Sequence, residues 1–205
     1  IGRLVQSAPV PPQHSSVHTD PALHDYVRWL QGRGQAAEAE TAAGMGSASA
    51  LGLNIQLPGP VGESNLYGLH ARGQILLVPE TEAGLHHQLA AVLATGNTAV
   101  IDEGAPFRAS LESLPASVAA RLRWSREWAA DGPYAGALIE GDAERIRSIT
   151  TRIAELPGPL VLVQAASADD MHRPDAYCLN WMLEEVSTSI NTAAAGGNAS
   201  LMAIG

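Results

Sequence analysis

The first residues that could take part in catalysis or metal binding are two adjacent histidines, His86 and His87. Neighbouring side chains on a helix point about 100° apart, so these two rings cannot hold one metal ion together. The pair also lacks the i, i+4 spacing that brings two imidazoles to the same metal. We therefore predict no metal site here, with one histidine facing solvent and the other packed in the core.

Cys178 is the only cysteine and lies in an aromatic and apolar stretch between Tyr177 and Trp181. A catalytic thiolate needs a nearby base or a helix N-terminus, and the local sequence supplies neither. We expect Cys178 to be a small core residue. No nucleophile-elbow serine or pair of catalytic carboxylates stands out, so the sequence predicts no catalytic residue.

The loop after the apolar run that ends at Val78 carries two carboxylates, Glu80 and Glu82. A dinucleotide site has glycines at this place, because the pyrophosphate must approach the backbone at the helix N-terminus. Carboxylates would repel the phosphates, and we interpret them as complements of the helix dipole. All 12 basic residues are arginine, which excludes a P-loop lysine and every lysine base.

Composition narrows the class of protein further. The 205 residues suit one large domain or one domain with an appendage, and 46% hydrophobic against 16% charged residues excludes a disordered chain. The formal charge of −9 argues against a nucleic-acid surface, and no apolar run is long enough to span a membrane. The chain begins with Ile1 without a signal-type stretch, and we expect a fragment of a longer cytoplasmic protein.

Strand and helix patterns alternate through the middle of the chain. They predict buried strands at 74–78, 97–101, 134–139 and 160–163, with helices at 82–94, 115–122 and 142–155. Such alternation predicts an α/β fold with an open, mostly parallel, Rossmann-like sheet. The expected core residues are Leu77, Val78, Leu89, Leu93, Val100, Ile139 and Val161.

The flanking segments are less regular. Residues 7–19 suit an extended approach, and Asp20-Pro21 predicts the start of a helix that ends at Gly32. Residues 35–49 hold few large side chains, so we predict a mobile linker, with an exposed Ala/Glu helix as the alternative. Residues 51–57 and 65–69 are short strand candidates.

The C-terminal stretch from Ser187 to Gly205 combines small polar residues with late apolar ones. Ser187–Ile190 and Leu201–Ile204 are β-prone, and Gly196-Gly197-Asn198 favours a turn. We predict a β-hairpin flap outside the sheet whose end docks on a neighbouring surface.

The tail from Asn191 to Gly205 resembles, nearly letter for letter, the C-terminal motif of long-form proline utilization A. This family comprises bacterial bifunctional flavoenzymes that oxidise proline to glutamate. The segment Leu57–Tyr67 is similar to the region just after that family's dehydrogenase module. The resemblance extends from about Gly2 to the end of the chain.

The middle of the chain, from Arg72 to Glu103, resembles the first strand–helix–strand unit of the aldehyde dehydrogenase fold. Working aldehyde dehydrogenases follow Gly-Asn-Thr with a strand ending in a ribose-binding lysine, but here the positions read Asp102-Glu103-Gly104. The motif Gly-Gln-x-Cys is missing, and Gly196-Gly197-Asn198 lacks the preceding catalytic glutamate. The resemblance thus implies an aldehyde-dehydrogenase-like domain with no catalytic, cofactor-binding or metal residues.

The patterns along the chain also predict a domain plan. Residues 1–34 would form the approach segment and helix, 35–49 the linker, 50–175 the α/β domain, and 176–205 the flap and tail. The implied parent is a cytoplasmic enzyme, peripheral at the inner membrane when reduced. It would hold an FAD-dependent proline dehydrogenase and an NAD-dependent glutamate-semialdehyde dehydrogenase, with neither cofactor in this segment.

The implied role is a non-catalytic lid that seals the passage between the two active sites. Its partner would be the dehydrogenase module of the same chain, with a homodimer through the tail as a further possibility. The alternative is a free-standing nucleotide-binding α/β enzyme. The residues expected to dock are in the tail: Asn191, Thr192, Gly196, Gly197, Asn198, Leu201, Met202 and Ile204.

Overall fold

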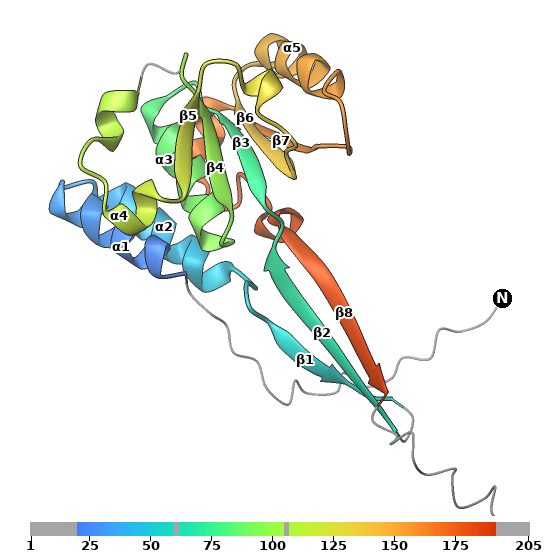
Figure 1. Ribbon diagram of the computed structural model, residues 1–205. Helices are drawn as coiled ribbons and strands as arrows, with labels where there is room; N and C mark the ends of the chain where they lie inside the picture. The colour runs from blue at the N-terminus through green and yellow to red at the C-terminus, as the bar shows by residue number, and fades with distance from the viewer. Residues whose placement is uncertain (1–19, 60–61, 105–106, 192–205) are drawn as a thin grey trace, which may run out of the picture.

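Strand–helix alternation builds a five-stranded parallel sheet. A computed structural model describes residues 20–59, 62–104 and 107–191 (Figure 1). The sheet order is β5-β4-β3-β6-β7, and every neighbouring pair is parallel. The predicted open α/β sheet is therefore confirmed. Its strands are β3 (Gln74–Val78), β4 (Thr98–Asp102), β5 (Leu122–Ser125), β6 (Gly136–Glu140) and β7 (Leu162–Ala166).

Helices cover both faces of this sheet (Figure 1). Alternate residues of β3 point to opposite faces, as the two-residue period of a strand requires. Ile75 and Leu77 join a core with four helices, whereas Leu76 and Val78 join a second core with the helix that follows β6. The α-helices of the described residues are α1 (Pro21–Gly32), α2 (Ala36–Ala48), α3 (Glu82–Ala94), α4 (Ala116–Ala119) and α5 (Ala143–Ala154).

The expected core is nearly complete in the structure. Leu77, Val78, Leu89, Leu93, Val100 and Ile139 are all buried. Val161 is only partly buried and packs against the edge of the second core. It precedes β7, an edge strand of the sheet, which begins at Leu162 rather than at the predicted position 160. Leu160 is 96% exposed, so this run is not the doubly covered strand that its apolar residues suggested.

Residues 35–49 are not the predicted linker, because α2 occupies most of them. The stripe Ala39, Ala42 and Met45 recurs at helical spacing and is buried. Small side chains let α2 pack closely against α1 and α3, so the helix buries one face although it has few large apolar residues. The alternative helix is present, but it is not the exposed helix that was considered.

Two further elements differ from prediction. The helix expected over 115–122 is the single turn α4, and the chain then enters β5 as the outermost strand beside β4. Short 3₁₀ turns make up much of the remaining connections: η1 (Arg108–Leu111), η2 (Trp128–Ala130), η3 (Ala168–His172) and η4 (Leu179–Met182). The approach segment 7–19 lies outside the described residues.

A second, antiparallel sheet projects from the body, and we call it the arm (Figure 1). It consists of β1 (Asn54–Leu57), β2 (Glu63–Ala71) and β8 (Leu183–Asn191), in the order β1-β2-β8. β8 pairs with β2 along its full length, from Leu183 opposite Ala71 to Asn191 opposite Glu63. The predicted strand at 187–190 is confirmed within β8, and its described partner is β2, which comes from earlier in the chain. The expected strand at 201–204 lies outside the described residues.

Candidate functional site

The sheet has one topological switch point, between β3 and β6. From β3 the chain moves outward to β4 and β5, then returns to β6 on the other side of β3 and continues to β7. In open α/β sheets, ligands bind outside the carboxyl ends of the strands at such a point. Val78 ends β3 and Glu140 ends β6, so these two residues border the crevice.

The side chain of Glu140 fills this crevice. Glu140 is fully buried, and its Oε2 accepts hydrogen bonds from the backbone N–H groups of Glu80 at 2.7 Å and Thr81 at 2.9 Å. Its Oε1 accepts from the Thr81 hydroxyl at 2.6 Å. These donors surround the N-terminus of α3, where the helix dipole favours negative charge. The buried carboxylate is thus satisfied by three donors and a favourable field.

Thr81 and Gly84 adapt the first turn of α3 to this carboxylate. Thr81 is the N-cap, and its hydroxyl oxygen accepts from the Gly84 N–H at 2.9 Å while donating to Glu140. A Cβ at position 84 would overlap the Glu140 carboxylate, so the carboxylate would have to move from its hydrogen-bonded position. Glycine is required here because the carboxylate lies directly against the helix.

Arg145 closes the same end of the sheet without pairing with the carboxylate. Its Nε donates to the Glu140 carbonyl at 3.0 Å, and its Nη2 donates to the Pro79 carbonyl at 3.2 Å. The guanidinium therefore links the ends of β3 and β6 through backbone oxygens. Glu82 lies in the first turn of α3, in agreement with the dipole interpretation.

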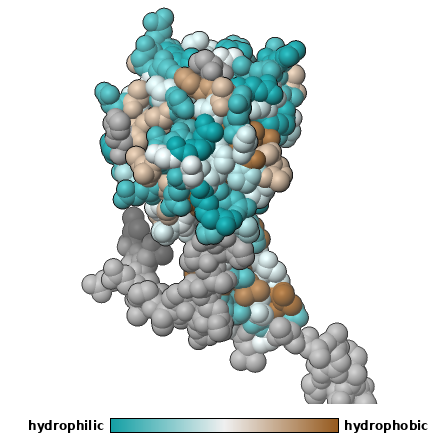
Figure 2. Space-filling view, turned by 90° about the vertical axis from the view of Figure 1, so that its left-hand side faces the viewer, coloured by the Kyte–Doolittle hydropathy of each residue, from teal (hydrophilic) through white to brown (hydrophobic). Residues whose placement is uncertain are grey.

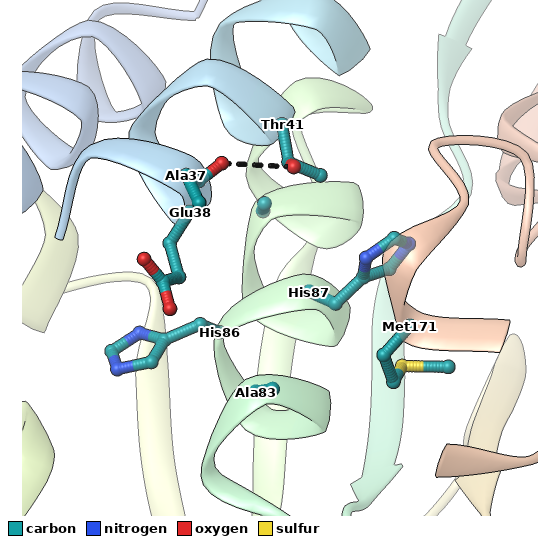
Figure 3. A pocket seen from close by; sticks show the side chains of 8 residues that line it. Ala37, Glu38, Thr41, Ala83, His86, His87 and Met171 are labelled. Carbon is teal, nitrogen blue, oxygen red and sulfur yellow. Dashed lines mark hydrogen bonds between the residues drawn. The ribbon is translucent and has the colours of Figure 1, made fainter. Parts of the chain in front are cut away.

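His86 and His87 lie on opposite sides of α3, but both are buried (Figure 3). The expectation that one of them faces solvent is wrong, because α1 and α2 cover one side of α3 and η3 approaches the other. The Tyr26 hydroxyl lies 2.6 Å from His86 Nδ1, and Gln35 Nε2 lies 3.2 Å from His86 Nε2. With the Gln35 amide turned by 180°, its oxygen would face His86 Nε2 and could accept a hydrogen bond from an N–H group there.

Burial lowers the pKa of both histidines, because the charged ring loses its hydration. Glu82 and Glu38 partly oppose this effect at His86, and a hydrogen bond with the Met171 backbone opposes it at His87. The two rings border a hollow of about 260 Å³ between α2 and α3 (Figure 3). Among the described residues, no group of three His, Cys, Asp or Glu side chains could hold a metal ion.

Cys178 is exposed rather than buried, so its expected core position is wrong. It precedes η4, and its backbone N–H and C=O both bond the side-chain amide of Gln164, at 2.6 and 3.1 Å. Tyr177 occupies the core position instead. Its hydroxyl donates to the Ile139 carbonyl at 3.1 Å and accepts from Gln88 Nε2 at 2.9 Å.

Asn97 joins the arm to the body. This residue is buried, and its Oδ1 accepts from the Gly73 N–H at 2.7 Å where β2 leads into β3. Its Nδ2 donates to the Met182 carbonyl at 2.9 Å, just before β8 begins. Arg72 adds bonds from Nε and Nη2 to the Leu183 carbonyl at 3.3 and 3.1 Å. One amide side chain thus fixes both strands that leave the body, a role that sequence reasoning missed.

The arm carries exposed apolar side chains (Figure 2), and the body also exposes large apolar side chains at Leu160, Leu162 and Trp181. Leu57, Val186 and Ile190 are 39%, 37% and 49% exposed, respectively. Of the residues predicted to dock, only Asn191 is described, and it ends β8 opposite Glu63. The others lie outside the described residues.

Comparisons with known proteins show the family of the chain. No protein-family model matches. The bifunctional protein PutA of Rhizobium meliloti is 68% identical over 206 residues, covering 100% of this chain and 17% of that protein. The bifunctional protein PutA of Salmonella typhimurium is 38% identical over 155 residues, covering 75% of this chain and 11% of that protein. The chain belongs to the PutA family. It spans less than a fifth of the PutA proteins that it matches.

Solved structures confirm the fold. Proline utilization A of Bradyrhizobium japonicum, in its D779W variant, matches with a TM-score of 0.53 and 24% identity over 71% of this chain and 19% of that one. A lactaldehyde dehydrogenase matches with a TM-score of 0.50 and 18% identity over 76% of this chain and 40% of that one. The PutA segment therefore has the aldehyde-dehydrogenase-like architecture that the sequence resemblance implied.

Dehydrogenases of this architecture imply a nicotinamide dinucleotide, and the crevice of the PutA segment does not fit one. The N–H groups that would meet a phosphate already bond the Glu140 carboxylate. The strand β4 ends at Asp102, and no lysine exists to hold a ribose. The backbone N–H groups at the switch point are therefore already occupied by a side chain of the protein itself.

Within the described residues, no helix is both long and apolar enough to cross a membrane.

Proposed function

We propose that this segment is a non-catalytic docking domain of a bifunctional proline-catabolic enzyme. It acts as a lid that seals the passage between a proline dehydrogenase and a glutamate-semialdehyde dehydrogenase, and it supports the latter. The parent is cytoplasmic and carries FAD and NAD in its other modules. This segment binds neither cofactor and contributes no catalytic residue.

The observation that carries the proposal is the arm. A sheet of three antiparallel strands extends from the body and presents Leu57, Val186 and Ile190 to solvent. Exposed apolar side chains on a projecting sheet mark an interaction surface. Because the relatives are several times longer than this chain, the rest of the parent chain is the partner most readily available to this surface. The tail follows β8 directly in the sequence.

The filled crevice supports the non-catalytic half of the proposal. A dehydrogenase must hold its cofactor at the carboxyl ends of the parallel strands, and here Glu140 occupies that place. The exposed Cys178 has no histidine or arginine side chain bonded to it among the described residues, so nothing there activates a thiolate.

The test is performed in the full-length parent by deleting residues 192–205, which leaves β8 intact. We expect proline oxidation to continue while NADH formation shows a lag or a reduced rate, because intermediate escapes from an unsealed passage. A second variant, Ile190→Arg, places a charge on the arm and should produce the same defect. The control Thr151→Arg lies on the exposed side of α5 and should behave as the unmodified parent.

Normal coupling in both the deletion and Ile190→Arg would overturn the lid. The homodimer is tested separately by sedimentation of the parent with and without residues 192–205. If deleting residues 192–205 abolishes both the dimer and the coupling, the tail forms an interface between two copies of the parent.

A further inference from the structure

We infer that Glu140 is a built-in anion that takes the place of a bound oxyanion at the switch point, so that removing its carboxylate creates a site for a small anion. The inference is independent of the lid, because it concerns only the crevice between β3 and β6.

The crevice has the donors of an anion site. Two consecutive backbone N–H groups, from Glu80 and Thr81, converge on one oxygen at 2.7 and 2.9 Å. A hydroxyl meets the other oxygen at 2.6 Å. The dipole of the 13-residue helix α3 adds partial positive charge at the same point. These donors recognise a carboxylate or phosphate oxygen whether it belongs to the chain or to a ligand.

The carboxylate leaves no room for a second anion. Glu140 is fully buried, and its Oε2 lies against the first turn of α3 at Gly84. The nearest guanidinium, that of Arg145, bonds backbone carbonyls instead of the carboxylate. The negative charge is therefore held by the same amides and helix end that would hold a ligand, which distinguishes this contact from an ordinary ion pair.

Removing the carboxylate should leave the donors in place. Thr81 remains fixed as the N-cap of α3 by its bond from Gly84 N–H, and Arg145 still links the strand ends. Glu140→Ala would then leave two part-buried N–H groups and one hydroxyl without an acceptor, which is costly. Acetate has the size and charge of the deleted group, so it should bind there and restore the lost stability.

The experiment measures thermal unfolding of the 205-residue chain as sodium acetate replaces sodium chloride at constant ionic strength and pH 7.5. We expect Glu140→Ala to unfold at a lower temperature than the unmodified chain in chloride. Acetate should then raise its Tm saturably by about 3–6 °C, the size expected when a site is filled at about ten times its Kd. The unmodified chain should show no such rise.

Glu140→Gln is the matched control. It keeps the shape of the side chain but replaces one acceptor oxygen by a donor, so it should lose stability without responding to acetate. Inorganic phosphate forms a second arm, and a larger rise with phosphate than with acetate would identify the vacated crevice as a phosphate site. Either rise supports the inference.

The inference is overturned if Glu140→Ala is as stable as the unmodified chain, or if neither anion raises its Tm more than chloride does. If Glu140→Ala does not fold in chloride, the yield of folded chain after refolding in acetate becomes the readout. Recovery supports the built-in anion, and equal failure in both salts rejects it. Saturable binding of NAD to the unmodified chain by calorimetry would also reject it.

Discussion

A methyl group at position 84 would occupy space that the Glu140 carboxylate now fills. Gly84→Ala should therefore destabilise the chain by about 1–3 kcal/mol, the usual cost of forcing extra volume into a packed site. The loss should occur although alanine is the better helix former. The midpoint of urea unfolding at constant slope measures the change.

Gly44→Ala is the matched control for this prediction. Gly44 also lies in a helix, α2, but nothing lies within 4 Å of the Cβ that would be added. Here helix propensity alone acts, so the chain should gain about 0.5–1 kcal/mol. Equal effects of the two substitutions would show that the carboxylate does not lie against α3.

The buried histidines give the chain a pH dependence near neutrality. Burial lowers the pKa of His86 and His87 below the unfolded value of about 6.5, so the unfolded chain binds more protons. Their contribution to stability is therefore complete above about pH 6.5 and is lost as the pH falls below that value. We expect the urea midpoint to decrease between pH 7.5 and 5.5.

The variant His86→Gln should flatten this decrease, because glutamine cannot titrate. His70→Gln changes an exposed residue of the arm and should leave the slope as it is. If the urea midpoint of His86→Gln falls as steeply with decreasing pH as that of the unmodified chain, other groups cause the pH dependence.

At the scale of elements, α3 is buried along nearly its whole length. Leu89→Ala should cost about 2–5 kcal/mol through lost burial and the cavity left behind. Leu160→Ala, at a residue that is 96% exposed, should stay within about 0.5 kcal/mol of the unmodified chain. An unchanged Tm in Leu89→Ala would mean that this face of α3 is not in the core.

Elements that carry their own signals could be predicted from the sequence. α3 has a threonine N-cap, an apolar face and a terminal Gly96, and its predicted bounds match the structure. The helix α2 was only the alternative to a linker, and its burial could not be predicted, because alanines become a buried face only when partner helices pack on them. β5 has only four residues, too few for alternation to distinguish it from the end of a helix.

The candidate site was the least predictable part. A glutamate that ends a strand has no distinctive local pattern, and Glu140 meets α3 only because β6 returns to the side of β3. Gly84 in the first turn of a predicted helix was the one local signal, since glycine there is otherwise unfavourable. Cys178 was misplaced for a related reason, because its neighbour Tyr177 takes the core position.

The orientation of the arm should depend on Asn97. Asn97→Ala removes the acceptor for Gly73 N–H and the donor for the Met182 carbonyl, so both strands leaving the body lose a fixed point. Spin labels at Thr188→Cys and Thr151→Cys, in a Cys178→Ser background, should show a broader distance distribution in this variant. Asn54→Ala, an exposed position on β1, should keep the distribution narrow. An unchanged distribution in Asn97→Ala would assign the orientation to the strand pairing alone.

For the whole molecule, a chain that ends at Asn191 should unfold at the same temperature as the 205-residue chain. The two hydrophobic cores of the body consist of residues between 22 and 182, and β8 retains its pairing with β2. Calorimetry of both lengths provides the measurement. A clear fall in Tm on truncation would mean that the tail stabilises the body in cis.

Glu140 and Gly84 impose an asymmetric constraint on how this domain can change during evolution. A glutamate at 140 in this pose leaves no space for a Cβ at 84, whereas a glycine at 84 by itself requires no particular side chain at 140. Among homologous sequences the covariation should therefore be one-sided, with every lineage that keeps the acid also keeping the glycine. Loss of the acid would pass through an intermediate with unsatisfied amides. Selection for stability alone would oppose that step, so the acid and the glycine should persist together.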